Sequence, residues 1–324
     1  MENDEQMKSV KLQKRVVPLA LLAVILFFAL WQPAQCQHPA KQVVLHFPPD
    51  RSLGKLYRLK IASPENPTAE DSPCAEARGN VTLPANTKLM LKVSYEGAAD
   101  LAPLAKCTDQ DVIYTIHACH VESLSDKSLQ DIAKLKSVKQ LLLTDTDITD
   151  KGAEYIGTMP QLLDLDVHET LITAKGLNSL RSLTALKKLE LDLLRIKGTD
   201  LACLVPMVHL QYLEVGRTGL ADNAMKNVGK LTSLVQLKVA KNADITDEGV
   251  FYLANLNNLQ ELSLRETGVT KKCLPVLQKL SRLTSVELSL PPQDVAQIAQ
   301  SLHKTNPGCQ IQGKTPKKEE EFFR

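Results

Sequence analysis

Aromatic side chains are scarce in this chain of 324 residues, where they make up 4% of the sequence and include a single tryptophan. An excess of charge of one sign is lacking as well, because 39 basic residues face 37 acidic ones and leave a net charge of +2. Proteins that bind nucleic acid need a strongly basic surface, so this balance gives no electrostatic case for nucleic acid as a partner. A hydrophobic content of 44% with so few aromatics is typical of a core built from leucine.

Sequence motifs of the common enzyme classes are also absent. The chain contains no nucleophile elbow, no glycine-rich phosphate loop and no His-Glu pair at metalloprotease spacing. Asp166 and Glu190 form the best candidate pair of carboxylates, but nothing in the sequence predicts a pocket that would shift their pKa values for catalysis. We therefore predict a protein without enzymatic activity, without a cofactor and without a small-molecule substrate.

Cysteine pairs at metal-binding or redox spacing are missing too, although the chain has seven cysteines. His117, Cys119 and His120 are the densest group of potential metal ligands. On a strand the first two would share one face and the third would point to the other, so we predict no metal site. Cys74 and Cys107 could form a disulfide in an exported protein, and the sequence leaves this open.

What the sequence does contain is an apolar phrase that returns every 24 residues. Its first position is occupied by Leu141, Leu165, Leu189, Leu213, Leu237, Leu262 and Val286, with one spacing of 25. Its second position holds Leu143, Val167, Leu191, Val215, Val239, Leu264 and Leu288. A short pair follows in most units: Ser125-Asp126, Thr149-Asp150, Thr173-Ala174, Ala221-Asp222, Thr246-Asp247 and Thr270-Lys271. Self-similarity at this period predicts a solenoid in which each unit buries its apolar side against its neighbours.

Each unit is predicted to be a short strand followed by a capped helix. The alternation in the L-x-L phrase suits a strand, because successive side chains point to opposite faces. In the second half of a unit the apolar residues recur at helical spacing, as Leu177, Leu180 and Leu183 do. A Thr or Asp just before this stripe can accept a hydrogen bond from a free backbone N–H at the start of the helix.

These units resemble the leucine-rich repeat family, in the bacterial form with an ITDxGL half, over about residues 112 to 302. The resemblance implies an α/β, ribonuclease-inhibitor-like fold: a right-handed solenoid with parallel strands on the concave face, helices outside and a small β-rich N-terminal cap. Where the family often has Asn after the strand, this chain has Thr146, Thr170, Leu194, Thr218, Asn242 and Thr267. We expect the threonine hydroxyls to bridge adjacent turns in its place. Leu194 and Lys197-Gly198 mark the unit 184–207 as the least regular.

The N-terminus carries an export signal. Four basic residues between Lys8 and Arg15 precede the uncharged run Val16–Trp31. This order is typical of a secretory signal peptide, and the run is just shorter than the roughly 17 residues that a spanning helix needs. A cleaved signal peptide and an uncleaved anchor both remain open, and both place the repeats outside the cytoplasm. We predict an extracytoplasmic protein, either single-pass in the cell membrane with its N-terminus inside, or periplasmic or secreted after cleavage.

The resulting domain prediction has five parts. They are a basic cytoplasmic segment (1–15), a signal peptide or transmembrane anchor (16–35), a β-rich N-terminal cap (36–110), the leucine-rich repeats (111–302), and a C-terminal cap strand with a charged tail (303–324). In the cap, Ala77–Leu83 and Leu89–Ser94 alternate as two strands would around the turn Pro84-Ala85-Asn86.

The concave face of the solenoid is the predicted binding surface, because parallel repeats present their outward columns as one continuous sheet. The candidate partner-binding residues are Asp166, His168, Glu169, Glu190, Asp192, Glu214, Arg217, Lys238, Lys241, Arg265 and Glu266. The earlier rungs are mainly acidic and the later rungs mainly basic. A solvated strand face of mixed charge would need no functional explanation, so the alternatives are an ordinary surface and a ligand-binding one.

We therefore predict a non-enzymatic protein-protein interaction module that is exported, membrane-tethered and bound to a protein partner of unknown identity. Two alternatives stay open. One is an accessory or recognition subunit of an extracytoplasmic enzyme complex, and the other is a secreted effector or adhesin. The separation of acidic and basic rungs predicts an orienting, salt-sensitive interaction with the partner.

Overall fold

The structure is a computed structural model, and it describes residues 42–61, 67–107, 111–199 and 201–313. They belong to one compact unit, Gln42–Arg324. The predicted segments 1–15 and 16–35, and the tail beyond residue 313, lie outside the described residues. In the part of the chain that the structure describes, no helix is both long enough and apolar enough to cross a membrane.

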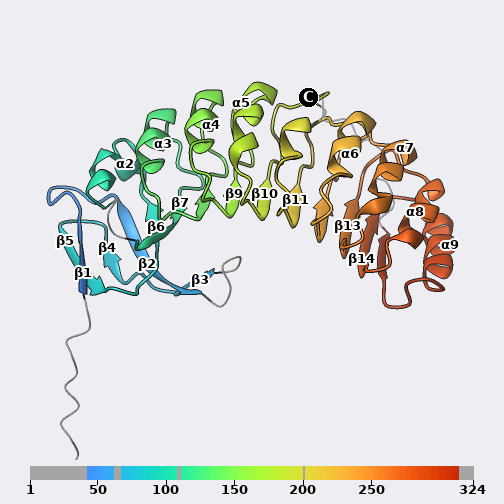
Figure 1. The fold of residues 1–324 in the computed structure, drawn as a ribbon, viewed down its shortest axis with the longest axis horizontal. Coiled ribbons are helices and arrows are strands. Elements are labelled where there is room, and N and C mark those ends of the chain that lie inside the picture. Colours follow the sequence, from blue (N-terminus) through green and yellow to red (C-terminus); the bar gives the residue numbers. More distant parts are fainter. Residues whose placement is uncertain (1–41, 62–66, 108–110, 200, 314–324) are drawn as a thin grey trace, which may run out of the picture. The chain divides into compact units, whose positions relative to one another are not determined.

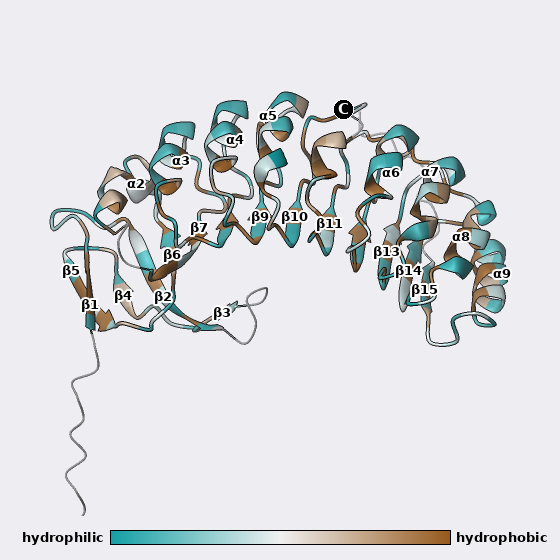
Figure 2. Cartoon of the chain, viewed as in Figure 1, coloured by the Kyte–Doolittle hydropathy of each residue, from teal (hydrophilic) through white to brown (hydrophobic). Residues whose placement is uncertain are grey.

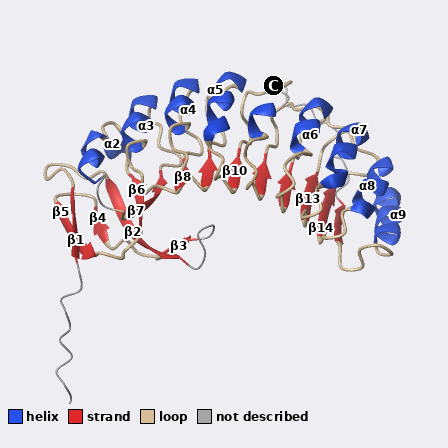
Figure 3. Ribbon diagram, in the orientation of Figure 1, coloured by secondary structure: helices blue, strands red, loops and turns tan. Residues whose placement is uncertain are grey.

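The repeats form a ladder of parallel strands. In chain order these are β7 (Ile113–His117), β8 (Gln140–Leu142), β9 (Asp164–Asp166), β10 (Lys188–Glu190), β11 (Tyr212–Glu214), β12 (Gln236–Lys238), β13 (Glu261–Leu264), β14 (Ser285–Leu288) and β15 (Gln310–Gly313). Each strand pairs in parallel with the next one along the chain. The strands line the inner side of the curved ladder and the helices line its outer side (Figures 1 and 3). The predicted right-handed α/β solenoid with a concave parallel sheet is confirmed.

Short helices return the chain on the outer side. The α-helices are α3 (Asp126–Ile132), α4 (Asp150–Ile156), α5 (Ala174–Ser179), α6 (Asp222–Val228), α7 (Asp247–Phe251), α8 (Leu274–Lys279) and α9 (Pro292–Leu302). The 3₁₀ turns are η2 (Leu180–Ser182), η3 (Ala202–Leu204), η4 (Tyr252–Asn255) and η5 (Lys271–Cys273). The unit 184–207 has only η3 where its neighbours have an α-helix, which confirms it as the least regular unit.

The apolar phrase explains why the units stack. Leu165, Leu189 and Leu213 lie opposite one another in adjacent strands, and all three are fully buried. Burying a leucine side chain contributes roughly 1.5–3 kcal/mol, so a continuous column of them holds successive units together. The strands begin one residue earlier than the sequence predicted, because hydrogen bonding already includes the polar residue before the first leucine. In Figure 2 apolar residues, coloured brown, recur along the ribbon from one unit to the next.

The Thr-Asp pair does more than cap its own helix. Thr246 accepts a hydrogen bond from the backbone N–H of Glu248 (3.2 Å), which is the predicted cap of α7. The backbone N–H and hydroxyl of Thr246 also donate to the carboxylate of Asp222 in the preceding unit, at 2.7 Å each. The same two bonds join Thr149 to Asp126, Thr173 to Asp150, and Thr270 to Asp247. The pair is therefore a link between units, which the sequence alone had not suggested.

The glycine of the ITDxGL motif leaves space for the same link between units. A Cβ on Gly249 would lie 2.3 Å from an oxygen of Asp222, and one on Gly176 would lie 2.3 Å from an oxygen of Asp150. The aspartate of one unit thus occupies the space that a side chain in the next unit would need. Ala224 is tolerated at the equivalent position because the preceding unit has Gly198 instead of an aspartate.

Asp222→Ala is expected to lower the free energy of unfolding by about 2 kcal/mol, because it leaves both donors of Thr246 without their partner. Urea unfolding followed by far-ultraviolet circular dichroism measures this change. Glu248→Ala serves as the control, since Glu248 is an exposed acid in the first turn of α7 and accepts no bond from the next unit. Equal losses for the two variants would contradict a link between units.

Threonine after the strand does not replace asparagine as expected. Thr146, Thr170 and Thr267 each donate their hydroxyl to the carbonyl three residues earlier, within their own turn, at 2.7–2.8 Å. The predicted bridge to an adjacent turn is therefore wrong for these three threonines, and it is met by Thr218, whose hydroxyl lies 3.2 Å from the amide oxygen of Asn242 in the next unit. Asn242 itself bridges adjacent turns. Its amide nitrogen donates to the carbonyls of Val215 (2.8 Å) and Val239 (3.0 Å).

The N-terminal cap joins directly onto the first repeat strand. It contains β1 (Gln42–His46), β2 (Gly54–Ile61), β3 (Pro67–Ala69), β4 (Ala75–Glu76), β5 (Asn80–Pro84), β6 (Leu89–Val93), α2 (Tyr95–Ala98) and η1 (Ala102–Cys107). The strands on either side of the predicted turn exist but do not pair with each other. β5 pairs with β1, while β6 is antiparallel to β2 on one side and parallel to β7 on the other. The cap thereby covers the apolar end of the solenoid.

Candidate functional site on the concave face

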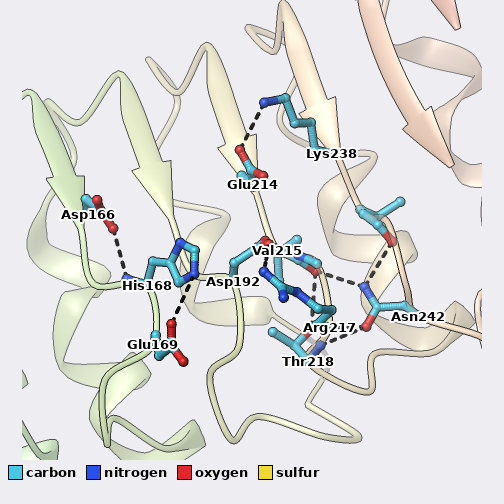
Figure 4. A network of polar contacts seen from close by, with 12 residues as sticks. Asp166, His168, Glu169, Asp192, Glu214, Val215, Arg217, Thr218, Lys238 and Asn242 are labelled. Carbon is cyan, nitrogen blue, oxygen red and sulfur yellow. Dashed lines mark hydrogen bonds and ion pairs between the residues drawn. The ribbon is translucent and has the colours of Figure 1, made fainter. Parts of the chain in front are cut away.

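The outward residues of the strands form columns along the concave sheet. Because the strands are in register, Glu190 lies opposite Glu214, and Glu214 lies opposite Lys238. The predicted acidic and basic halves meet at this last pair, where Lys238 Nζ lies 3.1 Å from a carboxylate oxygen of Glu214 (Figure 4). Lys188, on the same strand as Glu190, pairs with it at 2.6 Å. The charges at the centre of the face are therefore partly neutralised within the fold.

A rim of exposed side chains follows the strands. Glu169, Arg217, Lys241 and Glu266 are exposed, and their backbone φ angles lie between 54° and 57° except for 60° at Lys241. His120, Asp145 and Leu193 share this left-handed conformation at the equivalent place in their units. A non-glycine residue in this conformation costs roughly 1–2 kcal/mol. The sharp turn after each strand requires it, and it directs the side chains to the edge of the concave face.

Two of the predicted partner-binding residues serve the fold instead of facing solvent freely. Asp166 is 9% exposed and accepts a hydrogen bond from the backbone N–H of His168 (2.9 Å), as Figure 4 shows. Asp192 is 7% exposed and accepts from the backbone N–H of Gly216, which lies in the next unit. Each carboxylate satisfies a backbone donor at the end of a strand, so neither is an exposed charge on the concave face. Burial raises the pKa of Asp192 despite the bond from Gly216.

A buried polar cluster beside them was not predicted. Asp164 is 6% exposed, and burial, partly offset by Lys188, raises its pKa to about 6. Tyr212 lies on the next strand but one, and its ring is flanked by the ammonium groups of Lys188 and Lys238 at 5.2 and 5.1 Å. Its hydroxyl donates to Glu214. Asp164, Lys188 and Tyr212 occupy the position before the first leucine, which lies in the strand although the L-x-L phrase does not include it.

The integration of Glu190 and Glu214 in this cluster changes which variants are informative. Their side chains are only 20% and 24% exposed, and each accepts a charged hydrogen bond. Reversing their charges would break these pairs as well as alter the surface. Glu169 and Lys241 on the rim are better probes, because they are exposed and neither makes a short ion pair among the described residues.

A cavity of about 340 Å³ opens on the concave face beside this cluster. Its lining includes six of the predicted residues: Asp192, Glu214, Lys238, Lys241, Arg265 and Glu266. Gly216 has no side chain and Ala240 has only a methyl group where the neighbouring units have Asp192 and Arg265, so the surface is hollowed there. Asp166, His168, Glu169, Glu190 and Arg217 lie elsewhere on the face. The sequence signal for the cavity is this pair of small residues in one column.

The cysteines and the His-Cys-His group do not form a second site. Cys74 and Cys107 are both free thiols. His117 is half-buried, with its pKa lowered by burial and by nearby Lys92, while His120 points to the rim and lies 3.0 Å from Asp145. Among the described residues, no three His, Cys, Asp or Glu side chains are grouped so that they could hold a metal ion.

Comparisons with known proteins agree with this architecture. A family model described as Leucine Rich repeat matches residues 134–157 and 230–254. No curated protein matches the chain. Among solved structures, the internalin inlF from Listeria monocytogenes is similar with a TM-score of 0.50 and 21% identity, over 68% of this chain and 65% of that one. The internalin C2 (inlC2) from the same organism gives a TM-score of 0.42 and 23% identity, over 58% and 92%.

The alignment with inlF thus spans slightly less than two thirds of that protein, and at this identity it establishes the fold alone. The family model matches two units of the ladder, at the phrase around Leu141 and the phrase around Leu237. Both units have the buried L-x-L strand, the post-strand turn and the capped return that the other regular units share. The chain therefore contains units that match the leucine-rich repeat model, and it has the leucine-rich repeat fold.

Proposed function

We propose that this protein is a non-enzymatic binding module that holds a protein partner on its concave face. The single observation that carries the proposal is the cavity beside the junction of acidic and basic rungs, rimmed by exposed charges that the fold does not use. An interface needs a hollow that a partner side chain can fill and a polar rim around it. Lys241 and Glu266 belong to both the rim and the cavity lining.

The proposal extends to where the module works. The basic segment 1–15 and the apolar run in 16–35 favour export and tethering at the outer side of the cytoplasmic membrane. Protease added to spheroplasts is then expected to digest the repeats. Complete protection of a membrane-bound chain in intact spheroplasts would reverse the orientation.

Photo-crosslinking in native envelope extract tests the binding face directly. A photoreactive amino acid at Ser289, which follows the strand β14 on the concave face, is expected to give a discrete adduct with one partner. The same group at Lys226, an exposed residue of α6 on the outer side, is the matched control and should give none. The same adduct from both positions, or from Lys226 alone, would move the binding site off the concave face.

Charge reversal on the rim is expected to slow association with the crosslinked partner three- to tenfold at low salt, and less at high salt. The variants are Glu169→Lys in the acidic half and Lys241→Glu in the basic half, and both residues are exposed. Lys226→Glu, on the outer side, is expected to leave the association rate unchanged. Association rates from surface plasmon resonance at two salt concentrations provide the measurement. Unchanged rates for both rim variants would rule out the orienting role of this charge pattern.

A further inference from the structure

The cations that line the cavity are not equivalent. Lys238 is engaged by the fold, because its ammonium group lies 2.8 Å from the hydroxyl of Tyr212 and 3.1 Å from Glu214. Arg265 lines the same cavity, and its Nε atom is buried without a hydrogen-bond partner among the described residues. Lys241, on the rim, forms no ion pair with any residue that the structure describes. The unused donors of the cavity are therefore gathered at its basic end.

The acids of the cavity leave Arg265 unpaired because most have donors of their own. Asp192 accepts from the backbone of Gly216, and Glu287 accepts from the hydroxyl of Ser263 at 2.7 Å. Glu214 is held by Lys238 and Tyr212. A buried N–H of a guanidinium group that has no acceptor is costly, and such groups are usually paired in folded proteins. A hydrogen-bond acceptor supplied to Arg265 from outside would therefore be strongly favourable.

We propose that the basic end of this cavity receives the carboxylate of an aspartate or glutamate side chain from the partner protein, and that Arg265 is the residue that binds it. The guanidinium group of arginine donates two parallel hydrogen bonds to a carboxylate, a geometry that an ammonium group cannot reproduce. Lys241 lies on the adjacent rim and adds a second positive charge. This inference rests on the proposed function, since it names the chemistry of the partner at the same site.

The charges of the cavity favour a single carboxylate over a multiply charged anion. The lining contains four acids, at Asp192, Glu214, Glu266 and Glu287, against three bases at Lys238, Lys241 and Arg265. A phosphate group or a polyanion would meet these carboxylates as like charges, which disfavours its binding. A singly charged carboxylate needs only the local donors of Arg265 and Lys241. The volume of about 340 Å³ is ample for one acidic side chain.

Arginine side-chain NMR can test the site without the partner. The full-length protein is labelled with ¹⁵N at arginine, and the Nε–H signal of Arg265 is identified by its loss in Arg265→Lys. The probes are N-acetyl-glutamate methylamide and its uncharged counterpart N-acetyl-glutamine methylamide, at constant ionic strength. The glutamate probe is expected to shift the Arg265 signal saturably, with an affinity at least tenfold higher than that of the glutamine probe. Equal shifts with both probes, or none with either, would overturn the proposal.

Two further probes separate the possible sources of an anion. Acetyl-alanyl-alanine with a free C-terminal carboxylate represents a chain end, and inorganic phosphate represents a doubly charged anion. Both are expected to bind at least tenfold more weakly than the glutamate probe. Tighter binding of the chain-end probe would assign the site to a C-terminus, and tighter binding of phosphate would assign it to a phosphorylated ligand. Either result would overturn the side-chain assignment.

Variants of Arg265 then connect the site to the partner. Arg265→Gln is expected to lower the affinity for the crosslinked partner at least tenfold. Arg265→Lys is expected to lower it less, because lysine keeps the positive charge but loses the planar pair of donors. The urea midpoint of Arg265→Gln should be unchanged or raised, since an unpaired buried donor is removed. Arg181→Gln in η2, on the outer side, is the matched control. If Arg265→Gln binds the partner normally while the rim variants lose association rate, the proposed function stands and this inference fails.

Discussion

Asn242→Ala is expected to lower the free energy of unfolding by about 3–5 kcal/mol, the largest loss that we predict for a single polar side chain. Asn242 is 1% exposed, and its amide oxygen accepts from the backbone N–H groups of Thr218 and Leu220 at 3.1 Å each. Its amide nitrogen donates to two carbonyls, one in its own unit and one in the preceding unit. Alanine would leave four buried backbone groups without this partner, and each such group costs about 1–3 kcal/mol when it finds no other. Figure 4 shows this network.

The matched control for this variant is Thr267→Ala. Thr267 occupies the equivalent position one unit later, but its hydroxyl makes one bond, to the carbonyl of Leu264 in its own turn. We expect it to cost about 1 kcal/mol. Urea unfolding followed by far-ultraviolet circular dichroism measures both losses. Tryptophan fluorescence is less suitable, because the single tryptophan lies outside the repeats. Similar losses for the two variants would mean that the bridge between units contributes little.

Asp164→Asn is expected to stabilise the protein by about 3 kcal/mol at pH 7.5 and hardly at all at pH 4. Burial raises the pKa of Asp164 from 3.8 to about 6, so the folded protein keeps a proton that the unfolded chain releases above pH 4. Stability from this group is fully present below pH 4 and is lost as the pH rises through 6, at 1.36 kcal/mol per pH unit. The asparagine amide resembles the protonated acid and removes this dependence.

The measurement is the difference in unfolding free energy between wild type and variant from pH 4 to pH 7.5, in which the titration of all other groups cancels. The difference should grow between pH 4 and 6.5 and then stay constant. Lys188 keeps a partner in the variant, because Glu190 lies 2.6 Å from its ammonium group. Asp145→Asn, at an exposed aspartate on the rim, is the control for losing a carboxylate that is not buried. A difference that does not vary with pH would mean that Asp164 is ionised at no cost.

The repeat was predictable from the sequence because its signal is periodic and redundant. Leu165, Leu189 and Leu213 each mark a position that must be apolar because it is buried between two neighbouring units. A deviation in one unit therefore leaves the period recognisable from the others. The helix caps were also predictable, since Thr149 and Thr246 cap their own helices as expected. The hydrogen bonds of the aspartate that follows the capping residue were not predictable. Helix-capping rules describe bonds within one helix, whereas this aspartate accepts bonds from the threonine of the next unit.

The candidate site was predictable as a surface but not in its detail. The positions of Lys238, Lys241 and Arg265 on the concave face follow from the period alone. The burial of Asp166 and Asp192 does not, because it depends on backbone donors that the turn after the strand presents to them. The cavity depends on the coincidence of two small residues, Gly216 and Ala240, in one column of adjacent units. The pairing of the cap strands was not predictable either. The sequence suggests that β5 and β6 pair across a turn, but β6 instead pairs with the first repeat strand, β7, which is distant in sequence.

The hydrogen-bonded link between Thr and Asp is interrupted on both sides of the unit 184–207. Ala174 has no carboxylate where Lys197 has no threonine hydroxyl, and Gly198 has no carboxylate where Ala221 has no hydroxyl. The carboxylate and the hydroxyl are missing together at each junction, so no side chain is left without its partner. When the solenoid bends, we expect its outer layer to separate first at these two junctions, which form a seam around the unit 184–207. The seam separates the rung of Asp166 from that of Lys238, so flexing there would change the span between the two charged halves and let one chain fit partners of different width.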